Sequence, residues 1–324
     1  MKRLFSGIQP TGEIHIGNYL GAIKNWVELQ DKYECIYCIV DMHAITIEYD
    51  ISQMQQRIHR CATDLLACGI NPEKSLLFVQ SKVPQHTELA WILNTVTPIG
   101  ELERMTQFKD KSKQHRENIN SGLFTYPVLQ TADIILYKAE AVPVGEDQVQ
   151  HIELAREIVR KFNARYGEVF PEPQALTHEA KRILGLDGKN KMSKSMNNYI
   201  SLMDSPKDVW DKVRVAVTDP QRVLRNDPGN PDICNVFTLD KFFSPKEQLE
   251  MVDRECRKGT IGCVDHKKMF AENLSKHLAP IQERAKEFNA DPQKVRKLLD
   301  EGAEKCRIIA ENTLAEVKKS MGLA

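Results

Sequence analysis

The sequence has no long apolar run, no net charge and no internal repeat, and each absence excludes a class of protein. No stretch of its 324 residues approaches the length needed to cross a bilayer, so a membrane-spanning protein is not expected. Basic and acidic residues number 45 each, which gives a formal net charge of zero and no overall basic field that would attract nucleic acid. Any contact with RNA must therefore come from local patches.

The chain also lacks the pattern of an export signal, because the stretch before Gly7 is too short to form one. Eight cysteines in a chain without such a signal are expected to be reduced thiols, which indicates a cytoplasmic protein. The length of 324 residues suggests one large domain and a smaller one, and a hydrophobic content of 41% is enough for a core.

Apolar runs alternate with helical patterns in the first part of the chain, which predicts a parallel β-sheet wrapped by helices. We predict strands at residues 3–8, 34–41, 76–79 and 141–144. We predict helices at residues 17–31, 51–69, 86–96, 128–136 and 147–165. The fold class is therefore α/β, with a Rossmann-like doubly wound sheet. Ligands bind such sheets at the carboxyl ends of the strands, where Gln9, Asp41, His43 and Gly145 fall.

Beyond residue 200 the pattern changes to helices alone. Ser205 is a predicted N-cap followed by proline in the first turn, and a stripe of valines follows at positions 209, 213 and 217. Asp291 and Pro292 open a last helix that has one apolar face. We predict a first domain over residues 1–199, a smaller all-helical domain over 200–290, and a C-terminal helix over 291–324 that packs back on the first domain.

The segment Lys191-Met192-Ser193-Lys194-Ser195 lies between a glycine-bearing turn and a polar run, which predicts a mobile loop. Two ammonium groups and two hydroxyls on such a loop suit a polyphosphate whose charge moves during a reaction. A solvated basic loop is the alternative.

A second motif runs from Gly12 to Asn18 and contains His15 and Gly17. It falls where a loop after a strand meets a helix, so backbone N–H groups at the helix start can face a phosphate. His15 and Asn18 can add side-chain hydrogen bonds to the same anion. A histidine that only caps the helix or lies on the surface is the alternative.

The two motifs together resemble the paired signatures of the class I aminoacyl-tRNA synthetases. Three further strings, at residues 5–12, 100–109 and 142–148, narrow the resemblance to the bacterial-type tryptophanyl-tRNA synthetases. The likeness runs from residue 3 to about residue 218 and returns at residues 300–305. The first motif ends in Asn18 where the class pattern has histidine, which is usual in the tryptophan branch.

The resemblance implies a tryptophan–tRNA ligase that uses ATP, L-tryptophan and tRNA(Trp) and releases AMP and pyrophosphate. It implies that the catalytic residues are Lys111, Lys191 and Lys194, which would bind the phosphates of ATP. Mg²⁺ would accompany ATP. It implies that the ATP site is formed by Gln9, Pro10, Thr11, His15, Gly17, Asn18, Gly145, Glu146, Asp147, Ile183 and the segment Lys191, Met192, Ser193, Lys194 and Ser195.

Selection of tryptophan requires one acceptor for the indole N–H, which is a donor only. Asp133 fits this role, and a carboxylate on a helix surface is the alternative. The resemblance also places Gln9 and Gln130 in the slot, the latter where the family often has methionine. It implies that Phe5, His43, Val142 and Val144 line the slot and that Tyr126 and Gln148 reach the amino group. His43 as an ordinary core histidine is the alternative.

The resemblance further implies that the helical region reads the anticodon and that the protein is a symmetric homodimer. No platform of aromatic residues in that region identifies the reading residues. A polar stretch could meet the acceptor phosphates of the tRNA, with a solvated loop as the alternative for its last three residues. Its residues are Lys109, Lys111, Lys113, His115 and Arg116.

The cysteines form two groups. Cys35, Cys38, Cys61, Cys68 and Cys306 fall in apolar patterns and are expected to pack in the core. The second group has the number and kind of ligands that suit zinc or an iron–sulfur cluster. It consists of Cys234, Cys256, Cys263 and His266. Some tryptophanyl-tRNA synthetases hold such a cluster with four cysteines at similar spacing; since His266 takes the fourth position here, a site without metal is the alternative.

Three other functions compete with tryptophan–tRNA ligase. The tyrosyl-tRNA synthetases of the same subclass usually have a tyrosine on the first strand, where this chain has Phe5. A non-catalytic RNA-binding relative would not need both motifs and Asp133. Other adenylyltransferases resemble the first motif but lack the lysine loop and the long helical tail.

Overall fold

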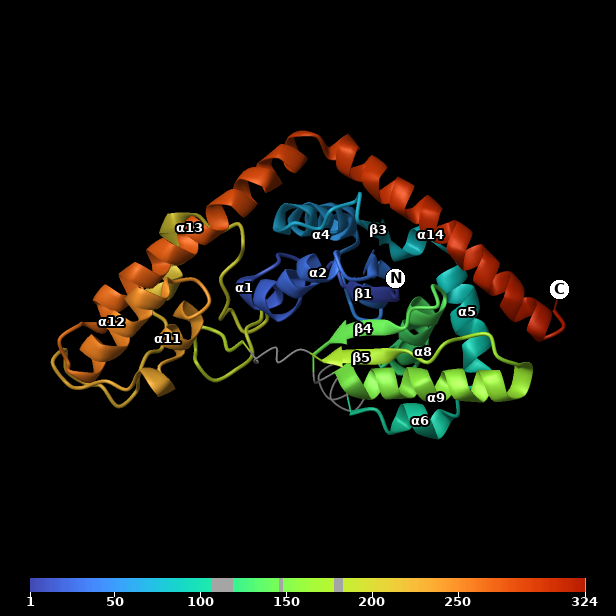
Figure 1. The fold of residues 1–324 in the computed structure, drawn as a ribbon, viewed down its shortest axis with the longest axis horizontal. Helices are drawn as coiled ribbons and strands as arrows, with labels where there is room; N and C mark the ends of the chain where they lie inside the picture. The colour runs from blue at the N-terminus through green and yellow to red at the C-terminus, as the bar shows by residue number, and fades with distance from the viewer. Residues whose placement is uncertain (107–118, 146–147, 178–182, 324) are drawn as a thin grey trace. The chain divides into compact units, whose positions relative to one another are not determined.

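The computed structural model describes residues 1–106, 119–145, 148–177 and 183–323 (Figure 1). The chain divides into two compact units. The first, which we call the sheet unit, comprises Met1–Gly12, Asn25–Glu179 and Phe288–Ala324. The second, the helical unit, comprises Glu13–Lys24 and Ala180–Glu287. The domain boundaries drawn from the sequence remain a prediction.

The sheet unit is built on a five-stranded sheet in which all strand pairs are parallel. The strand order is β3-β2-β1-β4-β5, so the order reverses between β1 and β4. The strands are β1(Arg3–Ile8), β2(Glu34–Ile39), β3(Ser75–Val79), β4(Ala141–Val144) and β5(Gln174–Thr177). The four predicted strands and the predicted α/β class are confirmed. The edge strand β5 was not predicted, because its four residues are only partly buried or exposed and show no apolar run.

The helices of this unit alternate with the strands, as the sequence predicts. Their bounds are α2(Lys24–Leu29), α3(Asp41–Ala44), α4(Met54–Cys68), α5(Gln85–Asn94), α6(Ile99–Glu103), α8(Ser121–Ile135), α9(Val149–Tyr166) and α14(Pro292–Ser320), with short turns at Ile51–Gln53 and Gln80–Lys82. Helix α4 ends at Gly69, whose φ of 113° is the left-handed conformation that glycine favours. Helix α8 begins at Ser121 rather than at 128. Its N-cap is Asn120, whose side chain accepts from the Leu123 N–H, and Pro127 lies inside the helix.

The two faces of the sheet carry different sets of side chains. Phe5, Cys38 and Phe78 belong to one buried cluster with residues of α5, α8, α9 and α14. Tyr37 stacks on Trp26 of α2 with ring centroids 5.1 Å apart. The prediction that the five cysteines of the first group pack in the core is confirmed: Cys35, Cys38, Cys61, Cys68 and Cys306 are all buried.

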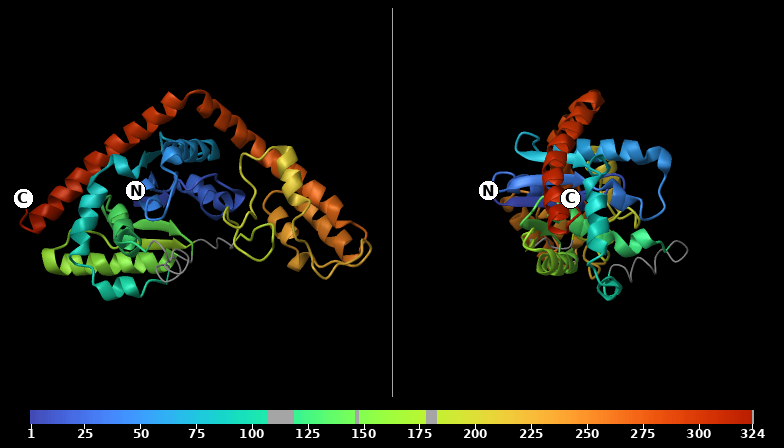
Figure 2. Two further views of the ribbon diagram at one scale, coloured as in Figure 1. Left: turned by 180° about the vertical axis from the view of Figure 1, so that it is seen from behind. Right: turned by 90° about the vertical axis from the view of Figure 1, so that its right-hand side faces the viewer.

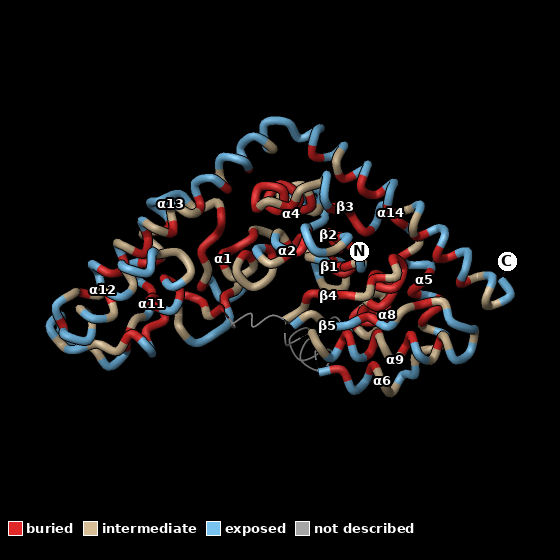
Figure 3. Tube along the Cα trace, viewed as in Figure 1, coloured by how far each residue is buried: buried red, intermediate tan, exposed pale blue. Residues whose placement is uncertain are grey.

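Helix α14 packs against β3 and α5 within the sheet unit (Figures 1 and 2). Its buried residues recur along one side and exposed residues occupy the other, as Figure 3 shows. At Gly302 the helix lies close to the strand, because a Cβ atom there would lie 2.1 Å from the backbone oxygen of Leu77. Only a residue without a side chain can lie this close to the strand.

Replacing Gly302 by alanine is therefore expected to destabilise the protein by about 1–3 kcal/mol, the usual cost of overpacking a core. The backbone of β3 cannot move aside, so α14 must shift. Gly21→Ala is the matched control, because a Cβ at this other helical glycine meets no atom within 4 Å. Urea unfolding checks the prediction, and equal midpoints for the two variants would contradict it.

The helical unit contains α1(Ile16–Asn18), a π-helical turn at Tyr19–Ile23, α10(Pro206–Val213), a short turn at Pro231–Ile233, α11(Asn235–Asp240), α12(Lys246–Arg257) and most of α13(Cys263–Ala290). The predicted N-cap is confirmed: Ser205 and Asp208 form a capping box at the start of α10. Val209 and Val213 are buried, but Val217 is exposed because α10 ends before it. In the described ranges, no helix combines the length and the apolar character that crossing a bilayer requires.

Candidate active site

The first motif contains the start of helix α1, which His15 precedes. His15 is the N-cap: its Nδ1 accepts from the backbone N–H of Asn18 at 3.3 Å. The Asn18 Oδ1 in turn accepts from the backbone N–H of His15 at 3.2 Å. This reciprocal capping fixes both side chains at the helix start. It also requires an unprotonated Nδ1, so the turn is built for a neutral imidazole.

Backbone pairing joins this turn to the segment that follows the lysine loop. The Ile16 N–H donates to the Ile200 carbonyl oxygen at 3.0 Å, and the Leu202 N–H donates to the Ile14 carbonyl oxygen at 3.0 Å. These two hydrogen bonds flank a β-bridge between His15 and Ser201. Residues almost 200 positions apart in the sequence are thereby fixed side by side within the helical unit.

The lysine loop itself is organised by Asp187 and Asn198. Asp187 accepts from the backbone N–H groups of Lys189 and Asn190, both at 3.1 Å, and from the side chain of Asn198 at 3.1 Å. Burial opposes ionisation of Asp187, but the hydrogen bonds from Asn190, Lys189 and Asn198 outweigh it and lower its pKa to about 2. The side chain of Asn198 also accepts from the Ser193 N–H at 2.8 Å. The predicted mobility of the loop remains a prediction.

Within this loop, Met192 connects the two motifs. Its backbone N–H donates to the Ile183 carbonyl oxygen at 3.0 Å, so predicted ATP-site residues on both sides of the turn are paired. Met192 is buried, and a Cβ at Gly17 would lie 3.2 Å from the Met192 Cβ. Gly17 therefore allows the close approach of the helix start to the loop.

The lysines of the loop act electrostatically on His15. Burial lowers the pKa of His15, and the positive charges of Lys194 and Lys191 lower it further, to about 4. The imidazole is neutral at pH 7, as the capping hydrogen bond requires. Burial is the larger cause, but the contribution of two ammonium groups marks a place where an anion would be stabilised.

We expect a bound triphosphate to raise the pKa of His15 from about 4 toward its ordinary value of 6.5, since the phosphates offset the lysine charges. NMR titration of the His15 ring protons with and without ATP checks this, with the other histidines as internal reference. In the protein without ATP, the folded state binds fewer protons than the unfolded state between pH 4 and 6.5. Stability contributed by His15 is therefore lost as the pH falls through this window. An unshifted signal on ATP binding would contradict the assignment.

In the sheet unit, the predicted tryptophan-site residue Asp133 is at the centre of a buried network. Its side chain is 1% exposed, and His43 Nε2 lies 2.7 Å from Asp133 Oδ2. Gln80 Nε2 donates to Asp133 Oδ1 at 2.7 Å, and His86 Nδ1 lies 2.6 Å from the same oxygen. Burial alone would raise the pKa of Asp133, but the charges and hydrogen bonds of His43 and His86 hold it well below its ordinary value. The carboxylate is therefore ionised and acceptor-only.

Two other predicted slot residues extend this network. The ring of His43 meets that of Tyr126 edge-on at 6.3 Å, and the Tyr126 hydroxyl lies 2.9 Å from His151 Nε2. Phe5 stacks on Tyr137 at 5.7 Å, and the Tyr137 hydroxyl lies 2.7 Å from His86 Nε2. The structure thus links Phe5, His43, Tyr126 and Asp133 through direct and ring contacts.

Four members of the network were not predicted from the sequence, namely Gln80, His86, Tyr137 and His151. One signal existed for Gln80, which directly follows β3 at the carboxyl edge of the sheet where ligands bind. For the others, the sequence shows only single polar residues in helical patterns.

The remaining predicted residues of the sheet unit lie on both sides of the point where the strand order reverses. Gln9, Pro10 and Thr11 follow β1, in a turn in which the Thr11 N–H donates to the Gln9 carbonyl oxygen at 2.8 Å. Gly145 follows β4, and the Gln148 N–H donates to its carbonyl oxygen at 2.9 Å. Val142 is buried, Val144 and Gln130 are partly buried, and Gln148 directly precedes α9 without a capping hydrogen bond from its side chain.

Several predicted residues lie outside the described part of the chain. They include two predicted ATP contacts and the whole basic stretch that we assigned to tRNA phosphates. The residues are Lys109, Lys111, Lys113, His115, Arg116, Glu146 and Asp147.

The predicted metal site is not supported by the structure. His266 Nε2 lies 3.0 Å from Asp240 Oδ2, and Arg222 Nη1 lies 3.7 Å from Cys256 Sγ and 3.8 Å from Cys263 Sγ. A guanidinium thus contacts two of the predicted ligands and a carboxylate contacts a third. Cys234 is buried beside them, in a small cavity that also contains the other three predicted ligands. Among the described residues, no three His, Cys, Asp or Glu side chains gather to hold a metal.

A parallel sheet of this order, together with a histidine turn that lies against a Lys-Met-Ser-Lys-Ser loop, defines a class I aminoacyl-tRNA synthetase. The family described as tRNA synthetases class I (W and Y) matches residues 1–279. The tryptophan–tRNA ligase of Deinococcus radiodurans is 53% identical over 327 residues, which cover 99% of each chain. The chain thus belongs to the bacterial tryptophan–tRNA ligases.

Two further relatives agree with this placement. The tryptophan–tRNA ligase of Thermotoga maritima is 44% identical over 326 residues, which cover 99% of each chain. The crystal structure of tryptophanyl-tRNA synthetase from Campylobacter jejuni complexed with ADP and tryptophan superposes with a TM-score of 0.90 at 36% identity, and the match covers 99% of this chain and 100% of that one.

Proposed function

We propose that the chain activates L-tryptophan with ATP and transfers the resulting aminoacyl group to the 3′ end of tRNA(Trp), with release of pyrophosphate and AMP. The observation that carries the proposal is the contact between the His15 turn and the loop that bears Lys191 and Lys194. The proposal also rests on the relatives named above, one of which was crystallised with ADP and tryptophan.

In the first step, the tryptophan carboxylate attacks the α-phosphorus of ATP and pyrophosphate leaves. The carboxylate is already ionised at neutral pH, so no general base is needed. Catalysis then consists of positioning the reactants and stabilising the charge that develops on the leaving phosphates. We assign this stabilisation to Lys191 and Lys194 in the helical unit and, outside the described residues, to Lys111.

The other contacts with ATP are assigned from the side chains of the residues and from the family resemblance. We assign phosphate contacts to the neutral His15 and the amide of Asn18, which add no charge of their own, and Gly17 would keep the backbone accessible. We assign Gln9, Pro10, Thr11, Gly145, Glu146, Asp147 and Ile183 to the same nucleotide. Mg²⁺, bound to the triphosphate, would neutralise part of its charge.

Tryptophan is recognised in this proposal by the network around Asp133. The ionised carboxylate accepts the indole N–H, and Phe5, His43, Val142 and Val144 supply the walls of the slot. Tyr126, Gln130, Gln148 and Gln9 complete it around the α-amino group. The helical region at 200–290 would bind the anticodon, and a cytoplasmic location follows from the tRNA substrate.

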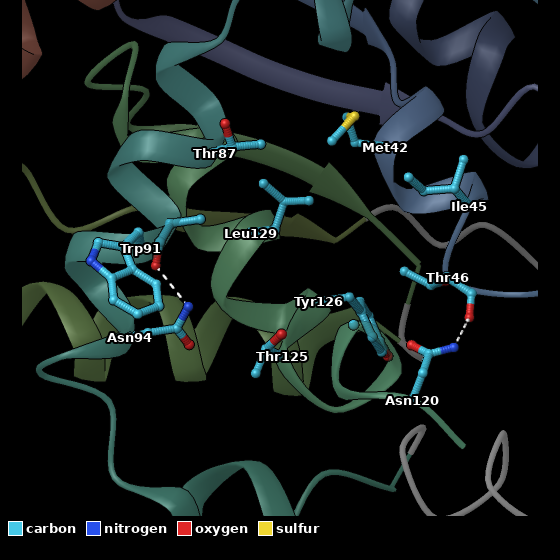
Figure 4. Close-up of a pocket in the computed structure, with 12 residues that line it drawn as sticks. Met42, Ile45, Thr46, Thr87, Trp91, Asn94, Asn120, Thr125, Tyr126 and Leu129 are labelled. Carbon is cyan, nitrogen blue, oxygen red and sulfur yellow. Dashed lines mark hydrogen bonds between the residues drawn. The ribbon is translucent and has the colours of Figure 1, made fainter. Parts of the chain in front are cut away.

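We also propose that the protein is a homodimer, joined at an exposed apolar face of the sheet unit. A cavity of about 360 Å³ lies between α3, α5 and α8, and its lining includes Ile45, Tyr126 and Leu129 (Figure 4). Trp91 lies at this cavity and is 74% exposed, and Ile45 is 44% exposed. Large apolar side chains are rarely exposed together on a monomer, so a second copy is the occupant we expect.

The substitution Trp91→Glu is expected to weaken the dimer at least about 100-fold, because a central interface tryptophan is replaced by a charge. Sedimentation velocity over a range of concentrations measures the effect. Ile308→Glu, at an exposed position of α14, is the control and should leave the association unchanged. Equal association of both variants would exclude this face as the interface.

The experiment that tests the proposed function is ATP–pyrophosphate exchange with each of the twenty amino acids. We expect exchange with tryptophan alone, followed by charging of tRNA(Trp). Exchange with tyrosine and not tryptophan would establish the tyrosine enzyme instead, and no exchange with any amino acid would favour a non-catalytic RNA-binding relative.

A further inference from the structure

The buried network around Asp133 contains two side chains to which the proposed function gives no role. Gln80 is fully buried and His86 is 1% exposed, and both bond to the same carboxylate oxygen, Oδ1. The other oxygen, Oδ2, faces His43, which is 7% exposed and contacts Tyr126. The Oδ1 side is thus closed inside the protein, and the Oδ2 side adjoins the residues assigned to the tryptophan slot.

The orientation of Gln80 is fixed by a second hydrogen bond. Its Oε1 accepts from the backbone N–H of Met42 at 3.1 Å, which leaves its amide NH₂ directed at Asp133. Met42 belongs to α3, the short helix that also carries His43. One glutamine therefore ties the carboxylate to the backbone beside its other partner.

The orientation of His86 is fixed in a similar way. Its Nε2 lies 2.7 Å from the hydroxyl of Tyr137, and its ring stacks on Phe78 with centroids 5.7 Å apart. Because an ionised carboxylate only accepts hydrogen bonds, Nδ1 must donate to Asp133. The ring is therefore held in one orientation by partners at both nitrogens and on its face.

The hydrogen bonds to Asp133 leave part of its acceptor capacity unused. An ionised carboxylate accepts about four hydrogen bonds, two at each oxygen. Gln80 and His86 use both positions at Oδ1, and His43 uses one at Oδ2. With respect to the described part of the chain, one acceptor position remains, on the side of His43. A single remaining acceptor matches the indole ring, which donates one N–H and accepts nothing.

We propose that Gln80 and His86 are specificity-determining positioning residues, which rests on the proposed function. By occupying Oδ1 they turn the carboxylate so that its one open acceptor meets an aromatic ring bearing a single N–H donor. They do not touch the amino acid. A phenol can also donate to this position, but Gln80, His86 and His43 supply no donor to its oxygen, since each is directed at Asp133.

The test compares tryptophan with its benzothiophene analogue, in which sulfur replaces the indole N–H, in pyrophosphate exchange. The ratio of kcat/KM for the two substrates measures the contribution of the N–H alone. A hydrogen bond to a charged acceptor predicts a ratio of about 10- to 150-fold for the unsubstituted enzyme. We expect Gln80→Met and His86→Leu each to reduce this ratio at least about fivefold, with the KM for ATP unchanged.

Two further variants keep the test decisive if either substitution impairs folding. His86→Asn keeps a donor toward Asp133 and should retain most of the ratio, and Tyr137→Phe should reduce it by a smaller factor. Calorimetric binding of both ligands gives the same ratio without turnover. If activity toward both substrates falls equally, the residues are only structural and the proposal is overturned.

The same measurements distinguish failure of this inference from failure of the proposed function. If the unsubstituted enzyme exchanges pyrophosphate with tryptophan and Asp133→Asn removes the discrimination, while the Gln80 and His86 variants retain it, this inference alone fails. If the unsubstituted enzyme shows no exchange with tryptophan, the proposed function fails and the inference fails with it.

Discussion

Replacing Lys194 by methionine is expected to lower the rate of tryptophan activation about 10²- to 10³-fold. Methionine keeps the length of the side chain and removes only the ammonium group. The charge on the leaving pyrophosphate then loses one fixed cation, and the loss of one such contact typically costs about 2.7–4 kcal/mol of barrier. Because Lys194 is assigned to the transition state, the change should fall mainly on kcat and much less on the KM for tryptophan.

Lys189→Met is the matched control for this variant. Lys189 is an exposed lysine of the same loop, and only its backbone takes part in the hydrogen bonds that organise the turn. Its substitution should change the exchange rate less than about twofold, as expected for a surface charge. Equal losses in the two variants would show that the positive charge of the loop as a whole matters, and not the position of Lys194.

The second large effect is expected for Asp133→Asn, which should lower kcat/KM for tryptophan about 10³-fold. A site built to bind a substrate N–H loses most when its acceptor is changed, because buried partners are left unpaired. Here the new amide would turn donors toward Gln80, His86 or His43, all of which lie within 2.7 Å of the carboxylate oxygens. The KM for ATP should stay within about threefold.

The same substitution should also destabilise the fold by about 3–5 kcal/mol, the usual cost of breaking a buried charge network. Kinetics must therefore be measured where thermal unfolding shows that the variant is folded. Asp31→Asn is the control, since Asp31 is exposed and pairs only with Lys74 at the surface. A folded Asp133→Asn variant with normal tryptophan kinetics would show that another group accepts the indole N–H.

Much of the fold could be predicted from the sequence, because its signals are local. Buried parallel strands require continuous apolar runs, and β1 begins and ends at the predicted residues. The end of α4 at Gly69 and the capping box at Ser205 depend on single residues with strong backbone preferences. Where the local signal is weak, as in the partly exposed β5, the prediction fails.

Pro127 shows a different failure. The sequence prediction places this helix at residues 128–136, after Pro127, and proline lacks the N–H that an interior helical turn uses. In the structure, α8 runs from Ser121 through Pro127 to Ile135, and most of the helix is buried in the core. Packing of the apolar face outweighs the loss of one hydrogen bond.

The site was predictable where a motif carries it and not where tertiary contacts create it. The His15 turn and the lysine loop are recognisable strings, and the structure brings them together. The positions of Gln80 and His86 around Asp133 depend on three separate elements and leave no pattern in the sequence. The same limit explains the metal prediction. The spacing of Cys256, Cys263 and His266 could not show that Arg222 would donate to the two sulfurs or that Asp240 would lie against the histidine ring.

A crystal structure of the chain with a non-hydrolysable ATP analogue and tryptophan tests the central claim most directly. We predict that phosphate oxygens of the analogue lie within hydrogen-bond distance of the residues 15–18 turn and of the ammonium groups of Lys191 and Lys194 at once. A nucleotide bound elsewhere, with both motifs facing solvent, would contradict the account.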